Sequence, residues 1–262
     1  MKRFFQNIKK YNRYAMRSAK AELQSEVAGS YLNWLWWIIE PFFFMLIYTF
    51  VFGVVFQNKQ EYFACFVFIG LNIWQFFNRM VSGSVKLIVG NRDLVTKVYI
   101  PKYILLLSKS YTYLFKLAIA ILLTFGLMIY QGVPFTWHII MIFPVIAVIY
   151  LIAFGLGLIL MNFGVTLADL PKLVDLGLRL LFYLSGVFYN IEARLASMEK
   201  VAYLLLRGNP VAFCMHQMRE CMIYGNNLTW WGIGVWFVVG ILLCILGVFI
   251  IHRNENSYAK VI

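Results

Sequence analysis

The strongest constraint on the fold is the apolar run from Trp34 to Phe56, WLWWIIEPFFFMLIYTFVFGVVF, in which Glu40 is the single charged residue. As a helix that rises ~1.5 Å per residue, this run reaches about 34 Å, and the hydrocarbon core of a bilayer is about 30 Å thick. A basic segment and then tryptophans precede the apolar part, which is typical of a chain that enters a membrane from the cytoplasm. The run therefore predicts a membrane protein.

Five later stretches continue this pattern, so we expect an all-α polytopic membrane protein with six transmembrane helices in a domain covering residues 34–251. The later predicted spans are 63–77 with an extension toward 84, 110–130, 137–161, 173–189 and 229–251. Segments assigned to the inside hold about fifteen Lys and Arg, and those assigned to the outside hold about five. Both termini, including the tail 252–262, are therefore predicted in the cytoplasm.

The composition agrees with a membrane protein and excludes other classes. Hydrophobic residues make up 62% of the chain and charged residues 13%, whereas a soluble domain is roughly half apolar and a quarter charged. The net charge of +12 gathers at predicted cytoplasmic ends, where topology and anionic lipid explain it, so nucleic-acid binding is not expected. No cleavable signal peptide is expected, because the N-terminal region is long and charged before its first apolar run.

The four cysteines are interpreted as small buried hydrophobic residues. Cys214, His216 and Cys221 lie close together in the sequence, but their spacing matches no standard zinc pattern. No metal site is therefore expected.

Residues 1–33 predict an amphipathic helix at the membrane interface. Phe4, Ile8 and Tyr11 recur on one helical face, and basic residues are frequent between them. A helix of this kind lies on the inner leaflet. The alternative is a solvated basic tail, and the recurrent aromatic residues favour the helix.

The loop 86–109 is expected to return to the cytoplasm, and it holds five basic residues and one acid. Leu94, Val95 and Val98 stand at helical spacing, and Pro101 ends the pattern. We therefore expect a short amphipathic helix in this loop. The alternative is a positive anchor that only fixes the topology.

Polar residues inside the predicted spans indicate surfaces that do not face lipid. The later half of the second span carries three of them, Asn72, Gln75 and Asn78. We expect these to face a partner helix or a water-filled cavity. Asp175 and Arg179 stand four residues apart and are expected to pair, and Lys116 is expected to snorkel to the inner surface.

Two further patterns concern packing. Gly155 and Gly157 in the fourth span indicate close helix packing and not a nucleotide-binding fingerprint, because the third glycine and the preceding strand are missing. Residues 190–227 mix charges with apolar runs that are too short to cross a membrane. This extracellular region predicts re-entrant helices that dip into the outer leaflet and return.

Four stretches carry a resemblance that covers almost the whole chain. They are Leu35-Trp36 with Glu40-Pro41 and Tyr48–Phe52; Asn91, Leu94-Val95, Lys97–Tyr99, Pro101-Lys102, Ile104-Leu105 and Leu107-Ser108; Tyr183 with Ser185–Tyr189; and Asn209-Pro210 with Arg219-Glu220 and Tyr224-Gly225. In this order and spacing they resemble the permease subunit of type-2 ABC exporters, which move polysaccharide such as O-antigen or capsule, or teichoic acid, across the bacterial cytoplasmic membrane. One departure is the pair of acids Glu22 and Glu26, where the family commonly has basic residues.

The resemblance implies that two copies of the chain pair as a homodimer and that two ATPase subunits dock on their cytoplasmic face. The chain has no GxxxxGK[ST] loop, so ATP and magnesium would bind the partner ATPase and no cofactor is expected here. The N-terminal helix and the inner loop would receive the motion of the ATPase. The expected coupling residues are Asn91, Arg92, Asp93, Leu94, Lys97, Val98, Tyr99 and Pro101.

By the same resemblance, the substrate is a polymer on an undecaprenyl-type lipid diphosphate. Three basic residues are candidates for binding this diphosphate, with ordinary topology charges as the alternative: Arg13, Arg17 and Lys20. Aromatic faces suit the passage of sugars, and aromatic belts at the membrane interface are the alternative. The candidate channel residues are Tyr48, Phe52, Tyr183 and Tyr189.

Two other functions are left open by the sequence. An integral membrane enzyme that acts on polyprenyl lipid would need clustered carboxylates for a metal or a His and Asp pair, and here 11 acids and 3 histidines are scattered. No residue is therefore expected to be catalytic. An exporter of small molecules or lipids from the same transporter class would differ only in its substrate.

Overall fold

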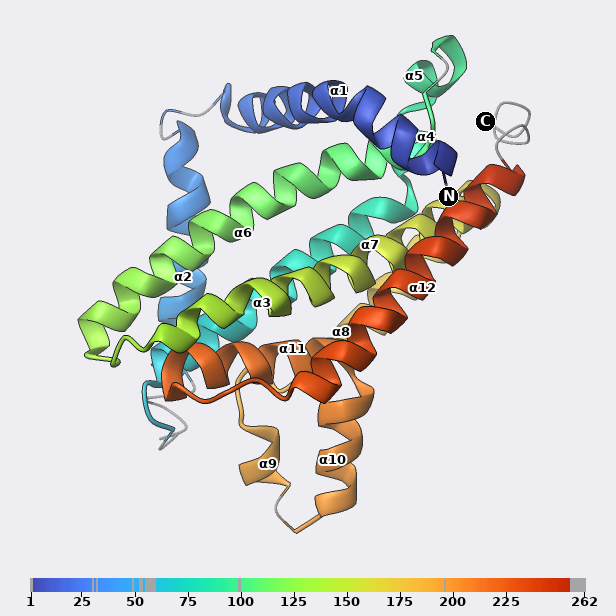
Figure 1. Ribbon diagram of the computed structural model, residues 1–262. Helices are drawn as coiled ribbons and strands as arrows, with labels where there is room; N and C mark the ends of the chain where they lie inside the picture. Colours follow the sequence, from blue (N-terminus) through green and yellow to red (C-terminus); the bar gives the residue numbers. More distant parts are fainter. Residues whose placement is uncertain are drawn as a thin grey trace.

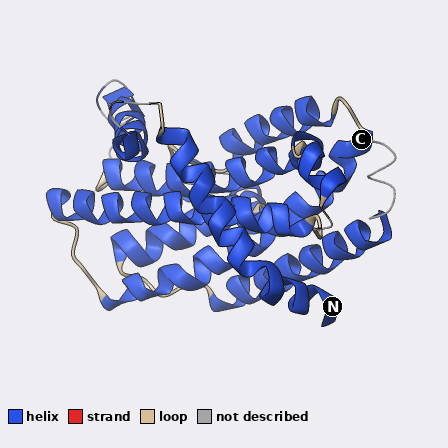
Figure 2. Ribbon diagram, turned by 90° about the horizontal axis from the view of Figure 1, so that it is seen from above, coloured by secondary structure: helices blue, strands red, loops and turns tan. Residues whose placement is uncertain are grey.

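Figure 1 shows the computed structural model of the protein, which describes residues 2–29, 31, 33–48, 50–51, 54, 60–98, 100–195 and 197–254. Within these ranges the regular elements are helices and no strand occurs (Figure 2), which confirms the expected all-α fold. In chain order the elements are α1 (Lys2–Val27), η1 (Asn33–Leu35), α2 (Trp36–Tyr48), α3 (Phe63–Val85), α4 (Leu87–Gly90), α5 (Arg92–Lys97), α6 (Tyr103–Gln131), η3 (Trp137–Met141), α7 (Ile142–Thr166), α8 (Leu170–Leu184), α9 (Ile191–Arg194), α10 (Glu199–Gly208), α11 (Pro210–Arg219), η4 (Glu220–Tyr224) and α12 (Trp230–Asn254).

Among the described residues, four helices are long and apolar enough to cross a bilayer: α3, α6, the segment Trp137–Thr166 that contains α7, and α12. They match the second, third, fourth and sixth predicted spans. Helix α2 has 13 residues, and part of the remaining predicted first span lies outside the described ranges. Helix α8 has 15 residues and reaches about 22 Å, less than a hydrocarbon core of about 30 Å. The count of six spans therefore stays a prediction.

Two helix boundaries differ from those expected from the sequence. Helix α6 begins at Tyr103 and not at Ser110, because residues 103–107 are buried apolar residues that continue the helix without a break. Helix α8 ends at Leu184 and not at Tyr189, because Gly186 has a φ of +66°, a left-handed conformation that favours glycine. The end of α3 at Val85 agrees with the extension that the sequence predicted.

Helix α3 is the centre of the fold. In its most apolar window 83% of the residues are buried, against 22% in α12. Helix α3 packs against α2, α6, α7, α8 and α11, whereas α12 packs mainly against α7. Apolar side chains of α12 such as Leu242 and Phe249 are exposed. In a bilayer this surface of α12 would contact lipid.

Glycines bring α7 into backbone contact with two neighbouring helices. A Cβ atom at Gly155 would lie 2.7 Å from the Cβ of Leu243 on α12, which is closer than real Cβ atoms approach. A Cβ atom at Gly164 would overlap the carbonyl oxygen of Val85 at the end of α3. The expectation that Gly155 serves close helix packing is confirmed. At these two crossings α7 therefore packs closely, backbone against backbone, on α12 and α3.

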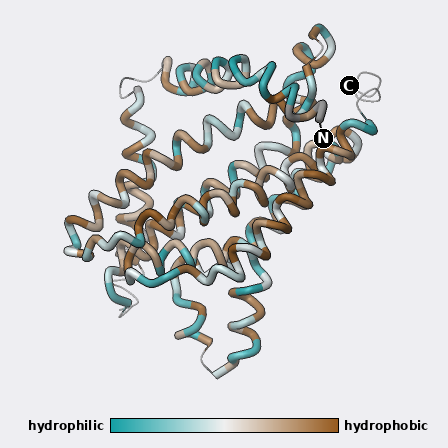
Figure 3. Tube along the Cα trace, viewed as in Figure 1, coloured by the Kyte–Doolittle hydropathy of each residue, from teal (hydrophilic) through white to brown (hydrophobic). Residues whose placement is uncertain are grey.

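The two ends of the molecule carry different segments. In Figure 1, α1, α4, α5 and the last turn of α12 lie at the upper end of the view, and α9 and α10 project from the lower end. The segments that the sequence assigned to the inside therefore gather at one end. Polar residues are frequent along α1, while hydrophobic residues dominate much of α7 and α12 (Figure 3).

Candidate functional site

The N-terminal helix α1 is docked on the first half of α6. The side-chain amide of Asn7 donates to the Tyr103 hydroxyl at 2.8 Å, and the Tyr111 hydroxyl donates to Asn12 Oδ1 at 2.7 Å. The Ser108 hydroxyl donates to the carbonyl oxygen of Ala15 at 3.1 Å. The expected amphipathic helix thus exists as α1, and its inner side is fixed to the transmembrane part. Its position at a membrane interface stays a prediction.

The three candidate diphosphate ligands, Arg13, Arg17 and Lys20, are all exposed on α1. They stand at helical spacing on the side away from Ala15 and Ala19, which are buried. The structure therefore brings these three cations together on one open face.

Two acids near the end of α1 pair with lysines of α6. A carboxylate oxygen of Glu26 lies 2.6 Å from Lys116 Nζ, and Glu22 pairs in the same way with Lys109. The ammonium group of Lys116 thus reaches the end of α1, and its snorkelling to the inner surface stays a prediction. The two acids that depart from the family pattern thus serve to clamp α1 to α6.

The expected coupling residues lie on and next to α5, at the same end of the molecule as α1 (Figure 1). Leu94 packs against the core, Val95 and Pro101 are buried, and the Asn91 side chain donates to the Leu87 carbonyl oxygen at 2.8 Å. These contacts hold the short helix in place. Three charged residues and one apolar residue remain exposed around it: Arg92, Asp93, Lys97 and Val98. Tyr99 lies outside the described residues.

Two of the four candidate channel aromatics meet at the end of α8. Tyr183 is 69% exposed, and the Tyr189 hydroxyl donates to the Tyr183 carbonyl oxygen at 2.7 Å. The side chain of Tyr48 and the whole of Phe52 lie outside the part of the chain that the structure describes. Of the four candidates, the structure therefore places the side chains of Tyr183 and Tyr189, which lie together at the end of α8.

A cavity of about 410 Å³, here called the α8 cavity, opens beside Tyr183. Its walls come from α3 and α8 and consist of Trp74, Asn78, Asp175, Leu178, Arg179, Phe182 and Tyr183. The expectation that Asn78 faces a cavity is confirmed. Asp175 and Arg179 both line the cavity, but no ion pair joins them among the described residues. Their charged groups are thus available to a ligand or a second chain.

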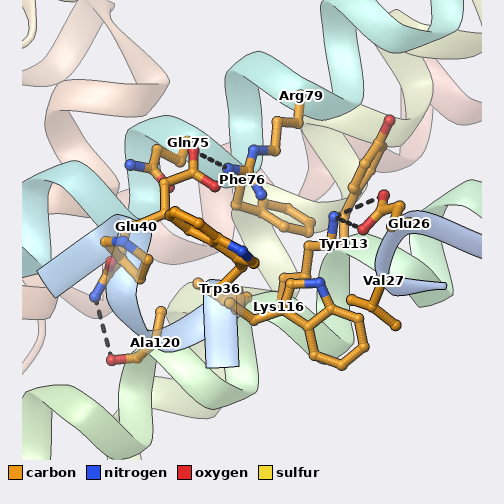
Figure 4. A pocket seen from close by; sticks show the side chains of 14 residues that line it. Glu26, Val27, Trp36, Glu40, Gln75, Phe76, Arg79, Tyr113, Lys116 and Ala120 are labelled. Carbon is orange, nitrogen blue, oxygen red and sulfur yellow. Dashed lines mark hydrogen bonds and ion pairs between the residues drawn. The ribbon is translucent and has the colours of Figure 1, made fainter. Parts of the chain in front are cut away.

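A second cavity, of about 310 Å³ and here called the α2–α3 cavity, lies between the end of α1 and helices α2, α3 and α6 (Figure 4). Its lining includes two charge pairs: Glu26 with Lys116, and Glu40 with Arg79 at 3.4 Å. Asn72 and Gln75 also line it, as the sequence predicted for polar residues in this span. Sequence reasoning missed the pair of Glu40 and Arg79. The available signal was that each is the single charged residue of its apolar segment.

Sequence reasoning also missed the structural role of Arg219. This arginine is 5% exposed, and its guanidinium donates to three carbonyl oxygens, those of Phe66 at 3.1 Å, Gly186 at 2.9 Å and Val187 at 2.8 Å. These bonds join α11 to α3 and to the turn after α8. Because a guanidinium group stays charged in proteins and has five N–H donors, it can donate to three carbonyl oxygens at once. The signal for this role was a lone cation beside an apolar segment.

Among the described residues, no group of three or more His, Cys, Asp and Glu side chains is placed to hold a metal ion. Cys214 and Cys221 are buried, and each is a free thiol. Both cavities are lined by charged and hydrogen-bonding side chains that can bind a ligand.

Comparisons with known proteins agree on one class. The family model described as ABC-2 type transporter matches residues 16–223. The chain is 33% identical over 231 residues to the O-antigen export system permease protein RfbA of Myxococcus xanthus, across 87% of this chain and 86% of that protein. Two proteins of the same name from Klebsiella pneumoniae are 24% and 25% identical, across 92% of both chains in each case. The region matched by the family model includes both cavities.

Proposed function

This chain belongs to the ABC-2 type transporter family, and on that premise we propose that it is the transmembrane subunit of an exporter of lipid-linked O-antigen polysaccharide. It is a membrane-embedded transport subunit and not an enzyme, and a partner ATPase subunit supplies the ATP hydrolysis. The observation that carries the proposed substrate is the 33% identity, across 87% of this chain, to a permease named for O-antigen export.

The proposed orientation puts α1, α4, α5 and both termini on the cytoplasmic side of the bacterial inner membrane. It is supported by the gathering of α1, α4 and α5 at one end (Figure 1) and by the excess of Lys and Arg in the segments that the sequence assigned to the inside. The re-entrant region with α9 and α10 then faces outward. In this orientation α5 meets the docked ATPase subunit. The exposed groups of Arg92, Asp93, Lys97 and Val98 supply charged and apolar contacts for it.

The proposed export path runs between two copies of the chain and uses the surface of α8. Its support is that α8 leaves large side chains uncovered: Leu173, Leu176, Leu180 and Tyr183 are each at least 59% exposed. With 15 residues, α8 is too short to span a bilayer on its own. Its exposed apolar face also indicates contact with a partner that a single copy does not supply. The α8 cavity adds the polar groups of Asp175 and Arg179 to this surface. A second copy facing α8 would enclose a path with aromatic and polar walls.

The lipid diphosphate of the substrate is assigned to the exposed row of Arg13, Arg17 and Lys20. The support is their common face on α1 and the absence of a carboxylate partner for any of them among the described ion pairs. Cations at the inner leaflet attract anionic headgroups at about 1 kcal/mol each. The row therefore concentrates the carrier lipid beside the entry to the path.

Reconstitution tests the function directly. The chain and its ATPase are placed in proteoliposomes with lipid-linked O-antigen, and translocation is followed by the access of a lectin to the glycan. ATP-dependent transport is expected, with none in the presence of a non-hydrolysable ATP analogue. A chain that moves a fluorescent phospholipid but no glycan would contradict the substrate and favour a lipid exporter of the same class.

The orientation is tested by cysteine labelling of intact cells. A cysteine at Arg92 should react only after the membrane is made permeable, and one at Glu192 should react at once. Three of the native cysteines, Cys65, Cys214 and Cys221, are buried and give a low background. Labelling of the Arg92→Cys variant in intact cells would overturn the proposed orientation.

A further inference from the structure

The α2–α3 cavity has a feature that transport by the α8 surface does not use. The side-chain oxygen Oδ1 of Asn72 is buried and has no hydrogen-bond partner, and the residue is 5% exposed. Its amide group donates to the Ala120 carbonyl oxygen at 3.4 Å and to the Thr124 hydroxyl at 3.1 Å, which fixes the orientation of the amide. A buried acceptor without a donor costs about 1–3 kcal/mol. Asn72 lines the cavity, so this fixed acceptor lies at the cavity wall, where a donor group of a bound ligand would satisfy it.

The cavity also holds charge in balance. Two carboxylates, Glu26 and Glu40, stand against two cations, Lys116 and Arg79. A ligand with a large net charge, such as a lipid diphosphate, would leave its excess negative charge uncompensated in this space. A ligand with one positive and one negative group would keep every charge paired. The balance therefore favours a zwitterion.

The polar groups are spread along α3 and do not converge on one point. Asn72, Gln75 and Arg79 line the cavity from the same face of α3, over about 10 Å of helix. Among the described residues, Arg79 is paired through a single nitrogen with Glu40 at 3.4 Å, and a guanidinium has five N–H donors. Its remaining donors suit a phosphate. At one end of this elongated site, N–H donors can bind a phosphate, and at the other end an oxygen can accept a hydrogen bond. Such a site suits a lipid headgroup better than a single ion.

The position of the cavity indicates where such a ligand comes from. One wall is the last turn of α1, and another carries Trp36 and Trp37, which are residues typical of the membrane–water interface. Beyond them α2 exposes apolar side chains, with Phe43 57% and Ile47 54% exposed. Acyl chains can lie along this surface while the headgroup enters the cavity. The ligand is therefore expected from the bilayer.

We propose that the α2–α3 cavity binds the phosphoethanolamine headgroup of a membrane phospholipid (Figure 4). The phosphate lies against the guanidinium of Arg79. The ammonium group donates to Asn72 Oδ1 and to the Glu40 carboxylate. Such a lipid would join α2 to α3 and α6, because the groups that hold it come from these helices and α1. The site is separate from the proposed export path and holds whether or not the substrate is O-antigen.

Native mass spectrometry of the full-length chain in detergent tests this proposal. Palmitoyl-oleoyl phosphatidylethanolamine and the matching phosphatidylglycerol are titrated separately, and soluble phosphoethanolamine is added as a competitor. We expect one retained phosphatidylethanolamine per chain, with an affinity about tenfold above that of phosphatidylglycerol, because a hydrogen-bonded charge is lost with the ammonium group. Soluble phosphoethanolamine is expected to compete only at much higher concentration, since it lacks the acyl chains.

Two variants assign the binding to this cavity. Asn72→Leu removes the free acceptor at nearly constant volume and should weaken phosphatidylethanolamine binding about tenfold. Asn78→Leu is the matched control, because it makes the same change on α3 in the α8 cavity and should leave binding unchanged. Arg79→Gln should lower the affinity for both lipids, since both carry the phosphate.

Several results would overturn the proposal. Equal affinity for the two lipids would show that the ammonium group makes no specific contact. Equal binding of soluble phosphoethanolamine would show that the ligand need not come from the membrane. An effect of Asn78→Leu equal to that of Asn72→Leu would place the lipid elsewhere. Absence of retained lipid from both monomer and dimer peaks would mean that the cavity is filled by water or by a second copy.

Discussion

The guanidinium of Arg219 lies 3.4 Å from the ring centroid of Phe66, and its Nε donates to the carbonyl oxygen of the same residue at 3.1 Å. One arginine thus holds both the side chain and the backbone of α3 from a helix more than a hundred residues later. The other two guanidinium nitrogens hold the turn after α8. Arg219 thus ties the turn after α8 to α3, in addition to the direct packing of α8 against α3.

Replacement of Arg219 by lysine should therefore destabilise the fold by about 3 kcal/mol, because an ammonium group cannot reach three carbonyl oxygens that a planar fork reaches. The thermal unfolding of the purified chain in detergent measures this effect. Arg207→Lys is the control, since Arg207 is exposed and lies over the Tyr203 ring at 4.6 Å, and a change below about 1 kcal/mol is expected. Equal effects of the two variants would show that Arg219 does not hold α11 in place.

Asn209 and Asn190 are two N-caps that differ in what else they hold. Each accepts from two backbone N–H groups of the helix that follows, α11 and α9 respectively. Asn209 is also buried and donates to the Ser185 hydroxyl at 2.9 Å. Asn209→Ala should cost about 2 kcal/mol and Asn190→Ala about 1 kcal/mol. Unfolding of both variants in one detergent checks the order, and a larger loss for Asn190→Ala would contradict it.

A side chain at Gly155 should separate α7 from α12. Its Cβ would meet Leu243 Cβ at 2.7 Å and the Cys244 nitrogen at 2.8 Å, and backbone atoms cannot move aside alone. We expect Gly155→Ala to destabilise the chain by about 1–3 kcal/mol. Gly126→Ala on α6 meets nothing within 4 Å and should be neutral or stabilising. Unfolding midpoints compare the two, and a neutral Gly155→Ala would exclude close packing at this crossing.

The ion pair between Glu26 and Lys116 should respond to charge reversal. Glu26→Lys and Lys116→Glu each place two like charges together between α1 and α6, and each is expected to lower stability by about 1 kcal/mol. The double variant restores opposite charges and should recover most of the loss. A double variant no better than the sum of the single ones would mean that the pair contributes nothing.

The exposed charges of α5 should affect coupling more than stability. Because hydrogen-bonded charge pairs contribute about 1.5–3 kcal/mol, loss of Arg92 or Asp93 should reduce transport by the reconstituted exporter about tenfold. ATP hydrolysis by the partner should persist. Tyr99→Ala is expected to lower transport in the same way. Thr96→Ala is the control, since its hydroxyl donates to the Arg92 carbonyl oxygen within α5, and normal transport is expected.

The sequence predicted those features that depend on local pattern. The all-α class follows from long apolar runs, and the polar face of α3 followed from the rarity of Asn72 and Gln75 in contact with lipid. Both residues do line a cavity. The short helix near Leu94 was likewise predicted by apolar spacing, and α5 is present.

What the sequence could not supply are partners that are distant along the chain. Glu40 and Arg79 lie in different apolar segments, and only the packing of α2 on α3 brings them together. The pairing of Lys116 with Glu26 could not be predicted either, because the two residues lie 90 positions apart in the sequence. In the proposed export path the candidate channel aromatics would face a second copy of the chain, and the pattern of one chain carries no information on such a contact.

The contact of Gly164 with the Val85 carbonyl has a mechanical consequence. No side chain lies between the two backbones at this crossing, so there is no rotamer to change and nothing soft to compress. Helix α4 begins two residues after Val85, so a displacement of α4 would act on α7 through this contact, and on α12 through Gly155. Helices α3, α7 and α12 are therefore expected to move together during a transport cycle.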